Sequence, residues 1–336
     1  MRLGVNLMAH SAATMAPEAE RLGYSTALAP EGLHDAVSVL GLAAGRTERL
    51  TLMSGVCQIP ARQPVLAAMT AATLAKLSDG RFRLGLGISN EHTTRNWYGA
   101  PFGRPLARTR EYVTVVRTAL RGDEVRYRGE HFALPLGEES AGFRLASGGV
   151  EVPLDLAAVG PRNLRLAGEI ADGWLGVFCS PEQLAVAVPE LAAGRQLAGR
   201  TMDGFEVTLT LPLALGDDVA TLARPIRGYV ARFLSLGHRR ANYYYRLAES
   251  MGYGTEAARV QDLYTAGDPA AAAAAVPLEF IEATALIGPA ERIADRLKAY
   301  AAAGATTLCV GSVAPTIDAQ VAMLGEAMDV LRSMGV

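Results

Sequence analysis

The sequence has little of several features that would point to particular classes of protein. Its three cysteines, Cys57, Cys179 and Cys309, stand far apart without metal-ligand spacing, which favours a reduced protein without a zinc site. The net charge is −2 and the pI about 6.2, so no basic field argues for nucleic-acid binding. Lys76 and Lys298 are the only lysines. An anion site would therefore use arginine or backbone N–H groups.

Long apolar runs and several catalytic motifs are also missing. No apolar stretch reaches the roughly 18–20 residues needed to cross a bilayer, so we expect no contact with the membrane interior. The opening residues MRLGVNLMAH begin directly in a strand pattern, without the charged and apolar regions of a secretion signal. We therefore expect a cytoplasmic protein. The motifs G-x-S-x-G, H-E-x-x-H and the phosphate-binding P-loop are absent as well, which argues against the common hydrolases.

What the sequence does contain is a regular alternation of short apolar strands and longer amphipathic or alanine-rich runs. The predicted strands are 3–9, 24–29, 50–56, 82–87, 154–159, 173–178, 206–213 and 306–311. The predicted helices are 13–22, 36–46, 65–77, 106–120, 163–170, 181–198, 289–303 and 317–334. Eight strands, each followed by a helix, predict an α/β protein with a (β/α)8 barrel. A doubly wound sheet is the alternative, but no G-x-G-x-x-G follows the first strand.

Two segments exceed a minimal barrel. Residues 121–152 have the composition of a β-rich excursion before the fifth strand. Residues 214–286 lie between the seventh and eighth strands and contain HRRANYYYRLAESMGYG and an alanine run. An insertion at that point should lie at the C-terminal mouth of a barrel, where such enzymes keep their sites. Without an internal repeat or a linker composition, we expect one domain over 1–336 that carries both insertions.

Side-chain alternation along two strands predicts which groups face the barrel interior. In RLGVNLMAH, Asn6, Met8 and His10 fall on the inward set near the mouth, and in RFRLGLG the inward set holds Gly85 and Gly87. Glycine removes side-chain volume, which we interpret as room for a flat ligand in the upper barrel. Relief of crowding in a tapering barrel is the alternative.

Carboxylates and histidines follow the predicted strands. Glu31 in LAPEGLHD ends the second strand and should reach the mouth, where it could act as a general acid or base. His34, Glu91 and His92 lie in loops at the same face. Each of these, taken singly, can equally be a solvated loop residue.

The stretch AVGPRNLRLAG predicts a strand end, a Gly-Pro turn and a helix start. Backbone N–H groups in the first turn of a helix are unpaired and attract anions. Arg162 stands beside them and Asn163 could cap the helix. We interpret the turn as a site for a phosphate-bearing ligand, with an ordinary strand–helix turn as the alternative.

Three motifs, in order along the chain, carry a resemblance to a known superfamily. They are IPARQPVLAAMTAATLAKLSDGRFRLGLGIS, GPRNLRLAGEIADGW and IGPAERIADRLKAYAAAGATTLCV. They resemble the bacterial luciferase-like superfamily over nearly the whole chain. REYVTVVRTALRGDEVRYRGEHFAL, HRRANYYYRLAESMGYG and AAAAVPLEFIEATALIGP are similar to its coenzyme F420-dependent oxidoreductases of actinobacterial type. The resemblance implies hydride transfer at C5 of F420, with the ring in the barrel mouth, and a homodimer.

The resemblance also implies which residues contact the cofactor. In GVCQIPARQP it implies a cis Gly55-Val56 peptide bond pressed against the deazaflavin ring, next to Cys57. Around the ring it implies Gly87, Ile88, Ser89 and Asn90. Along the ribityl-phosphate tail it implies Ala158, Gly160, Pro161, Arg162 and Asn163.

One departure from the superfamily bears on the catalytic acid. The related sugar-phosphate dehydrogenases place a Glu directly after the fourth-strand glycines, where this chain has Ile88. Their sugar substrates and their acid therefore do not carry over. Glu31, His10 or Glu91 could supply the proton instead, or the substrate needs none.

The leading hypothesis is an F420-dependent oxidoreductase that reduces a C=C or C=N bond of a small organic molecule, or catalyses the reverse. An FMN-dependent monooxygenase served by a separate reductase is the first alternative, because FMN and F420 share ring outline and phosphate tail. A barrel that binds ligands without catalysis is the second. It predicts a trans Gly55-Val56 bond and no saturable binding of either cofactor.

Overall fold

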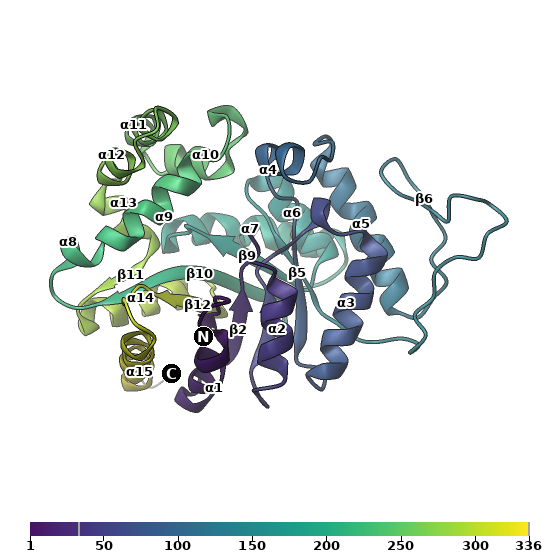
Figure 1. Ribbon diagram of the computed structural model, residues 1–336, viewed down its shortest axis with the longest axis horizontal. Helices are drawn as coiled ribbons and strands as arrows, with labels where there is room; N and C mark the ends of the chain where they lie inside the picture. The colour runs from purple at the N-terminus through teal and green to yellow at the C-terminus, as the bar shows by residue number, and fades with distance from the viewer. Residues whose placement is uncertain (33, 335–336) are drawn as a thin grey trace.

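A closed parallel barrel forms the centre of the computed structural model, which describes residues 1–32 and 34–334 (Figure 1). Its strands are β1 Arg2–Asn6, β2 Thr26–Ala29, β3 Thr51–Ser54, β5 Phe82–Gly87, β8 Leu154–Ala157, β9 Gly173–Val177, β10 Glu206–Leu215 and β12 Thr307–Ser312. Each strand pairs in parallel with the next, and β12 pairs with β1 to close the ring. The predicted (β/α)8 barrel is confirmed.

Helices surround the barrel. They are α1 Ala12–Leu22, α2 Ala36–Ala44, α3 Pro64–Leu77, α5 Pro105–Leu120, α6 Pro161–Ile170, α7 Pro181–Leu197, α14 Ala290–Ala302 and α15 Ile317–Ser333. The cap of α2 is Asp35, which accepts a hydrogen bond from Ser38 N at 2.9 Å, and that of α7 is Ser180, which accepts one from Gln183 N at 3.2 Å. Gly23 ends α1 with a φ of 95°. No helix within the described ranges is long and apolar enough to cross a membrane.

Two apolar layers follow from the alternation of side chains. Outward residues such as Leu52, Leu84 and Leu308 join the large core between strands and helices. Inward residues of the same strands form a small cluster in the barrel, made of Leu28, Met53, Leu175 and Cys309. Burial of this apolar surface is the main driving force for closing the barrel.

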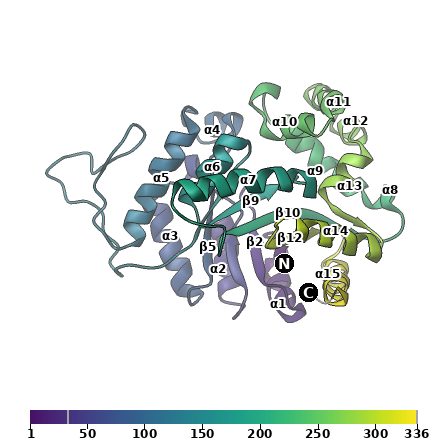
Figure 2. The same cartoon turned by 180° about the vertical axis from the view of Figure 1, so that it is seen from behind.

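The 121–152 segment projects from the body beside α5 as a thin arm (Figures 1 and 2). Its regular structure is a hairpin of two-residue strands, β6 Tyr127–Arg128 and β7 Ala133–Leu134. The predicted β-rich excursion is therefore present but short. Pro135 follows β7 directly, and proline cannot donate to a strand ladder.

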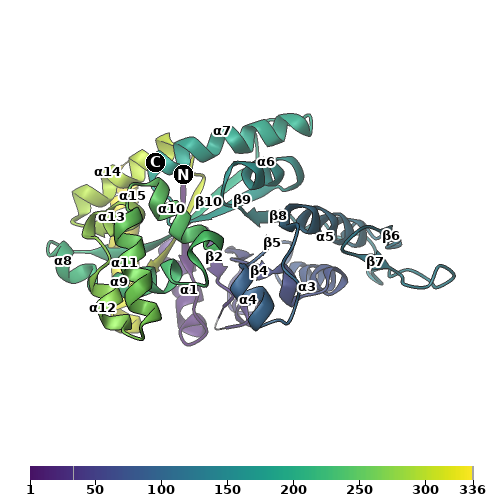
Figure 3. The same cartoon turned by 90° about the horizontal axis from the view of Figure 1, so that it is seen from above.

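The 214–286 segment is helical and lies over the C-terminal end of the barrel, as the third view shows (Figure 3). Its helices are α8 Val219–Leu222, α9 Arg224–Leu234, α10 Tyr243–Ser250, α11 Gly254–Thr265, α12 Pro269–Ala274 and α13 Leu278–Thr284. A short strand that the sequence did not predict, β11 Leu286–Gly288, pairs with the end of β10 and returns the chain to the barrel. The insertion thus covers part of the mouth.

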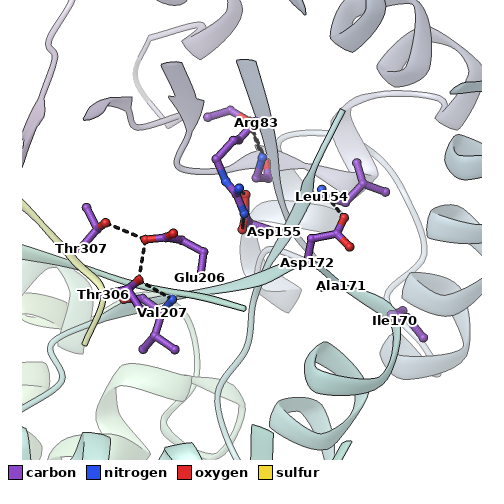
Figure 4. Close-up of polar contacts among 12 residues, drawn as sticks. Arg83, Leu154, Asp155, Ile170, Ala171, Asp172, Glu206, Val207, Thr306 and Thr307 are labelled. Atoms are coloured by element: carbon purple, nitrogen blue, oxygen red, sulfur yellow. Dashed lines mark hydrogen bonds and ion pairs between the residues drawn. The ribbon is translucent and has the colours of Figure 1, made fainter. Parts of the chain in front are cut away.

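The N-terminal end of the barrel is filled by paired polar groups (Figure 4). Arg83 donates two hydrogen bonds to the buried Asp155, from Nε at 2.9 Å and from Nη2 at 2.6 Å. Beside them the Glu206 carboxylate accepts hydrogen bonds from Thr307 Oγ1 and Arg2 Nη2, both at 2.6 Å. These bonds satisfy charges that would be costly if buried alone. The floor of the barrel is therefore closed.

Candidate active site

The third strand carries a bulge where it reaches the mouth. Met53 pairs with Arg83, and Cys57, in the short strand β4 Cys57–Gln58, pairs with Leu86. Between these two pairs the chain advances by four residues on the third strand and by three on β5, so one residue of the third strand is unpaired. The Gly55-Val56 peptide bond inside the bulge is cis, as predicted.

Ser54 holds the bulge against β5 through its side chain. Ser54 Oγ donates to the Gly85 carbonyl at 2.9 Å and accepts from Gly85 N at 2.9 Å. One hydroxyl thus satisfies both backbone groups that the bulge would leave unpaired.

This bulge fills the space beside the two inward glycines of β5. The prediction that these glycines leave room for a flat ligand is therefore wrong. A Cβ on Gly85 would lie 1.9 Å from the Ser54 carbonyl oxygen, and a Cβ on Gly87 would lie 2.5 Å from Val56 Cγ2. Both glycines face inward as predicted. Their function in the structure is to admit the backbone and Val56 of the neighbouring strand.

Inward positions at the C-terminal ends of other strands are partly open to solvent. They are Asn6, Ala157, Val177, Thr210 and Gly311, whereas the outward residues Leu209 and Leu211 beside Thr210 are buried. The upper barrel is thus lined by small or polar groups that a ligand can reach. Asn6 Oδ1 is buried there without a hydrogen-bond partner in the described chain, which fits a site completed by a polar ligand.

Glu31 lies beside the bulge in a half-buried ionic cluster with Arg62 and Asp35. Its Oε1 accepts from Gln58 N at 3.4 Å, and its Oε2 lies 3.5 Å from Arg62 Nη2. Arg62 also pairs with Asp35, and its carbonyl accepts from Tyr112 Oη at 3.1 Å. Arg62 belongs to the IPARQP motif, but it is separated from Glu31 by 31 residues, so nothing in the sequence indicated this pairing.

Burial dominates the electrostatics of this cluster. It raises the pKa of the Glu31 carboxyl, while the Arg62 guanidinium and the Gln58 N–H oppose the rise. Burial likewise raises the pKa of the Cys57 thiol to about 12, so Cys57 is a neutral, inert neighbour. A carboxyl with a raised pKa near a ligand site is suited to hold and release a proton.

The other two predicted acids have different surroundings. His10 is exposed in the turn after β1. Glu91 begins the short helix α4 Glu91–Asn96, and its Oε1 lies 3.0 Å from Arg95 Nε. Within the described ranges, neither residue forms a hydrogen bond or an ion pair with the cluster around Glu31, so the structure does not bring the three acids together.

The loop after β5 places its residues on opposite sides. The Ile88 side chain lines a small cleft outside the barrel with Pro60 and Phe102. Ser89 has a φ of 65°, a left-handed conformation that non-glycine residues rarely adopt outside special sites. The Asn90 side chain caps α4 by accepting from Thr93 N at 2.9 Å. The Ile88 and Asn90 side chains are therefore engaged outside the barrel.

The predicted anion turn starts α6. Gly160 is its cap, with a φ of 82°, and Pro161 occupies the first helical position. The prediction that Asn163 caps the helix is wrong, because the helix begins two residues earlier at Pro161. Arg162 is exposed beside this N-terminus. Ala158 is buried, and its carbonyl accepts from Trp174 Nε1 at 2.9 Å, so Ala157 is the inward residue there.

A cavity of about 170 Å³ separates the loop after β5 from the insertion over the mouth. It is lined by Asn90, Glu91, His92 and Arg95 on one side and by residues from Leu236 to Ala241 on the other. A Cβ on Gly237 would lie 2.9 Å from His92 Cβ. The insertion and α4 therefore touch above the barrel.

A parallel barrel with a buried acid, a bulge and an anion-ready helix end at the C-terminal mouth has the layout of an enzyme of the (β/α)8 class. The sequence pattern of the luciferase-like monooxygenases matches residues 5–307. The chain belongs to this luciferase-like family.

Two sequence relatives show which members of the family the chain resembles. The Mycobacterium tuberculosis protein named "Putative coenzyme F420-dependent oxidoreductase Rv3520c" is 34% identical over 310 residues, covering 89% of either chain. The 5,10-methylenetetrahydromethanopterin reductase of Methanopyrus kandleri is 28% identical over 306 residues, or 86% of this chain and 85% of the relative. The predicted kinship with F420-dependent oxidoreductases is confirmed.

Solved structures agree on the fold. The F420-dependent tetrahydromethanopterin reductase from Methanopyrus kandleri superposes with a TM-score of 0.83 at 24% identity, over 96% of this chain and 97% of that one. An F420-dependent secondary alcohol dehydrogenase in complex with an F420-acetone adduct gives 0.80 at 19% identity, over 98% and 99%.

Proposed function

We propose that this oxidoreductase, an F420-dependent member of the luciferase-like family, transfers a hydride between C5 of the deazaflavin and a small organic substrate. The favoured direction is reduction of a C=C or C=N bond. The observation that carries the proposal is the 34% identity to an F420-dependent oxidoreductase over 89% of both chains, together with an upper barrel whose inner positions are open. F420 supplies the hydride when it is bound.

The residues present fit such a cofactor. The Gly55-Val56 bulge, with the Val56 side chain packed on Gly87, offers a wall for the ring, and the Ile88 and Ser89 backbone lies at its edge. Asn6 Oδ1, which has no partner in the described ranges, offers an acceptor inside the barrel. At the other end of the site, the first turn of α6 and Arg162 would hold the anionic tail.

Glu31 is the proposed proton donor. Its carboxyl is buried beside the bulge, and burial raises its pKa, so it retains its proton to higher pH than an exposed carboxyl. Arg62 fixes its position through the 3.5 Å contact. His10 and Glu91 remain the alternative donors.

Cofactor titration tests the proposal. Apo-protein titrated with F420 should show saturable fluorescence changes, whereas tight FMN binding without a response to F420 would establish the monooxygenase alternative. Saturation by neither cofactor would establish a non-catalytic barrel.

A matched pair of variants on α6 tests the tail site. Arg162→Ala should raise the Kd for F420 about tenfold, the loss of about 1.4 kcal/mol of binding. Arg165→Ala is the control, because Arg165 is also exposed on α6 but pairs with Glu190. An unchanged Kd for Arg162→Ala contradicts this placement of the tail.

The proposal includes a cytoplasmic homodimer. The three cysteines are free and buried, which supports a reducing compartment. Leu42 on α2 and Leu66, Met69 and Leu77 on α3 are exposed apolar side chains on neighbouring helices, and such patches mark interfaces. Light scattering should give a dimer mass for the natural chain and a monomer mass for Leu66→Asp with Met69→Asp. Leu197→Asp on α7 is the control, and a monomeric natural chain contradicts the dimer.

A further inference from the structure

An aromatic cluster lies where β9 reaches the mouth. Phe178, the residue after β9, has a φ of 52°. Its ring centroid is 5.2 Å from that of Tyr229, 5.3 Å from Phe233 and 5.7 Å from Tyr244. Tyr229 and Phe233 are one turn apart on α9, and Tyr244 lies in the first turn of α10. Two parts of the chain therefore build one aromatic face.

This face is not a sealed core. The other side of α9, with Ile226, Val230 and Leu234, is buried against the helices of the insertion. Tyr229 is 40% exposed, and Phe233 and Tyr244 are partly exposed. Phe178 itself is buried, and the three rings packed around it form a surface that solvent partly reaches.

The topology places the face across the mouth from the acid. In the ring of strands, β9 stands four positions from β2, which is directly opposite in a barrel of eight. Glu31 follows β2, and Phe178 follows β9. The view from above shows α9 to one side of the strands, α10 lying across their ends, and α4 away from α9 (Figure 3). A ligand in the mouth therefore has the bulge and Glu31 on one side and the aromatic face on the other.

Two phenol groups give this face polar character. They belong to Tyr229 and Tyr244. Burial raises the pKa of the Tyr244 phenol to about 12. Both phenols are neutral at physiological pH and can donate a hydrogen bond.

We propose that the substrate carries a planar aromatic ring conjugated to the double bond that is reduced, and that this ring lies against Tyr229, Phe233 and Tyr244, which pack on the buried Phe178. Aromatic rings in edge-to-face or offset contact are stabilised beyond what burial of their surface alone contributes. The inference rests on the proposed function. One atom of the double bond gains the hydride that reduced F420 supplies, and the other gains the Glu31 proton. The bond is thereby reduced, and the cofactor is oxidised by two electrons.

Two probes that share the reacting bond test this inference. They are 4-phenyl-3-buten-2-one and 4-cyclohexyl-3-buten-2-one, which differ in the aromaticity of the ring. Their dissociation constants are measured by calorimetry on enzyme loaded with oxidised F420, so that no turnover occurs. The phenyl probe should bind at least about tenfold more tightly, which corresponds to about 1.4 kcal/mol.

Two variants test whether the aromatic face causes the preference for the phenyl probe. Tyr229→Leu keeps an apolar side chain without the ring and should reduce the preference to within about twofold, while the Kd for F420 stays unchanged. Tyr253→Leu is the control, because Tyr253 packs on Phe280 within the same insertion, outside the face, and should keep the preference. If F420 binds but the two probes have equal dissociation constants, or neither probe binds, the inference is overturned and the proposed function is not. If the natural chain does not bind F420, both the proposed function and the inference are overturned.

Discussion

The two ends of the barrel are built in opposite ways. At the N-terminal end, Arg83 and Asp155 satisfy one another inside the barrel with two hydrogen bonds. At the C-terminal end, Asn6 Oδ1 has no partner in the described ranges, and Glu31 is held by contacts of 3.4–3.5 Å. The N-terminal end also leaves one buried hydroxyl, Thr208 Oγ1, without a partner in the part of the chain that the structure describes, but its charged groups are paired at short distances. The closed end therefore stabilises the fold, whereas the open end can be completed by ligands.

The largest effect should come from breaking the closed end. Asp155→Ala leaves the Arg83 guanidinium buried without its partner, and we expect a loss of about 3–5 kcal/mol in the free energy of unfolding. Urea unfolding followed by circular dichroism measures it. Glu18→Ala removes the partner of Arg21 in an exposed ion pair and should cost less than about 1 kcal/mol. Equal losses for the two variants would contradict the assignment of stability to this end.

Gly85→Ala tests the seat of the bulge at the open end. The new Cβ would lie 1.9 Å from the Ser54 carbonyl oxygen, so the backbone must move, at a cost of about 1–3 kcal/mol. The Kd for F420 should rise as well, because the wall shifts. Gly41→Ala on α2 is the matched control: its Cβ meets nothing within 4 Å, and it should stabilise by up to about 1 kcal/mol. Thermal unfolding and F420 titration report both quantities.

The titration of Glu31, the proposed proton donor at the open end, should appear in the pH dependence of kcat/KM. A donor must be protonated, so the rate falls as the pH rises through the pKa of Glu31. Arg62→Ala removes the cation that lowers this pKa and should move the falling limb to higher pH, whereas Arg62→Lys should move it less. Glu31→Gln should lower kcat by about 100-fold or more. If His10→Ala or Glu91→Gln changes the falling limb of the pH profile and the Glu31 and Arg62 variants do not, the substituted residue is the proton donor in place of Glu31.

The smallest effect compares two left-handed residues, one at each end. Ser89 at the mouth has a φ of 65°, and Asp79, before β5, has a φ of 49°. Replacing either residue by glycine relieves backbone strain in the folded state but raises the conformational entropy of the unfolded chain. The two effects oppose one another, so the free energy of unfolding should change by less than about 1 kcal/mol. Ser89→Gly alone should raise the Kd for F420, by about twofold to fivefold, because the loop loses its fixed shape. A similar rise for Asp79→Gly would contradict a role for Ser89 in positioning.

The sequence was sufficient for the barrel because its determinants are local. Apolar strands, helix caps such as Asp35 and Ser180, and glycines at helix ends each act within a few residues. Alternation also placed Asn6, Gly85 and Gly87 on the inner face correctly. The prediction failed on what occupies the space at the glycines, because the bulge that fills it comes from another strand.

The site was harder to predict because its pairs are distant in sequence. Arg83 and Asp155 are 72 residues apart, and Glu31 and Arg62 are 31 apart, so only closure of the barrel brings them together. The aromatic face is an intermediate case. Tyr229 and Phe233 already share a helix face at the i, i+4 spacing, but nothing in the sequence shows that Phe178 meets them.

The extra residue at the bulge also changes the phase of the third strand. Met53 belongs to the cluster inside the barrel, yet Cys57, an even number of residues later, belongs to the core outside it. On an uninterrupted strand both side chains would point the same way. The bulge therefore shifts the phase of the strand by one position. If the same residues formed a regular strand without the bulge, Cys57 would point toward the barrel axis and Gln58 toward the helices. Deleting one residue between 53 and 57 would instead leave Cys57 facing the helices and would remove the surplus residue that forms the bulge at the mouth.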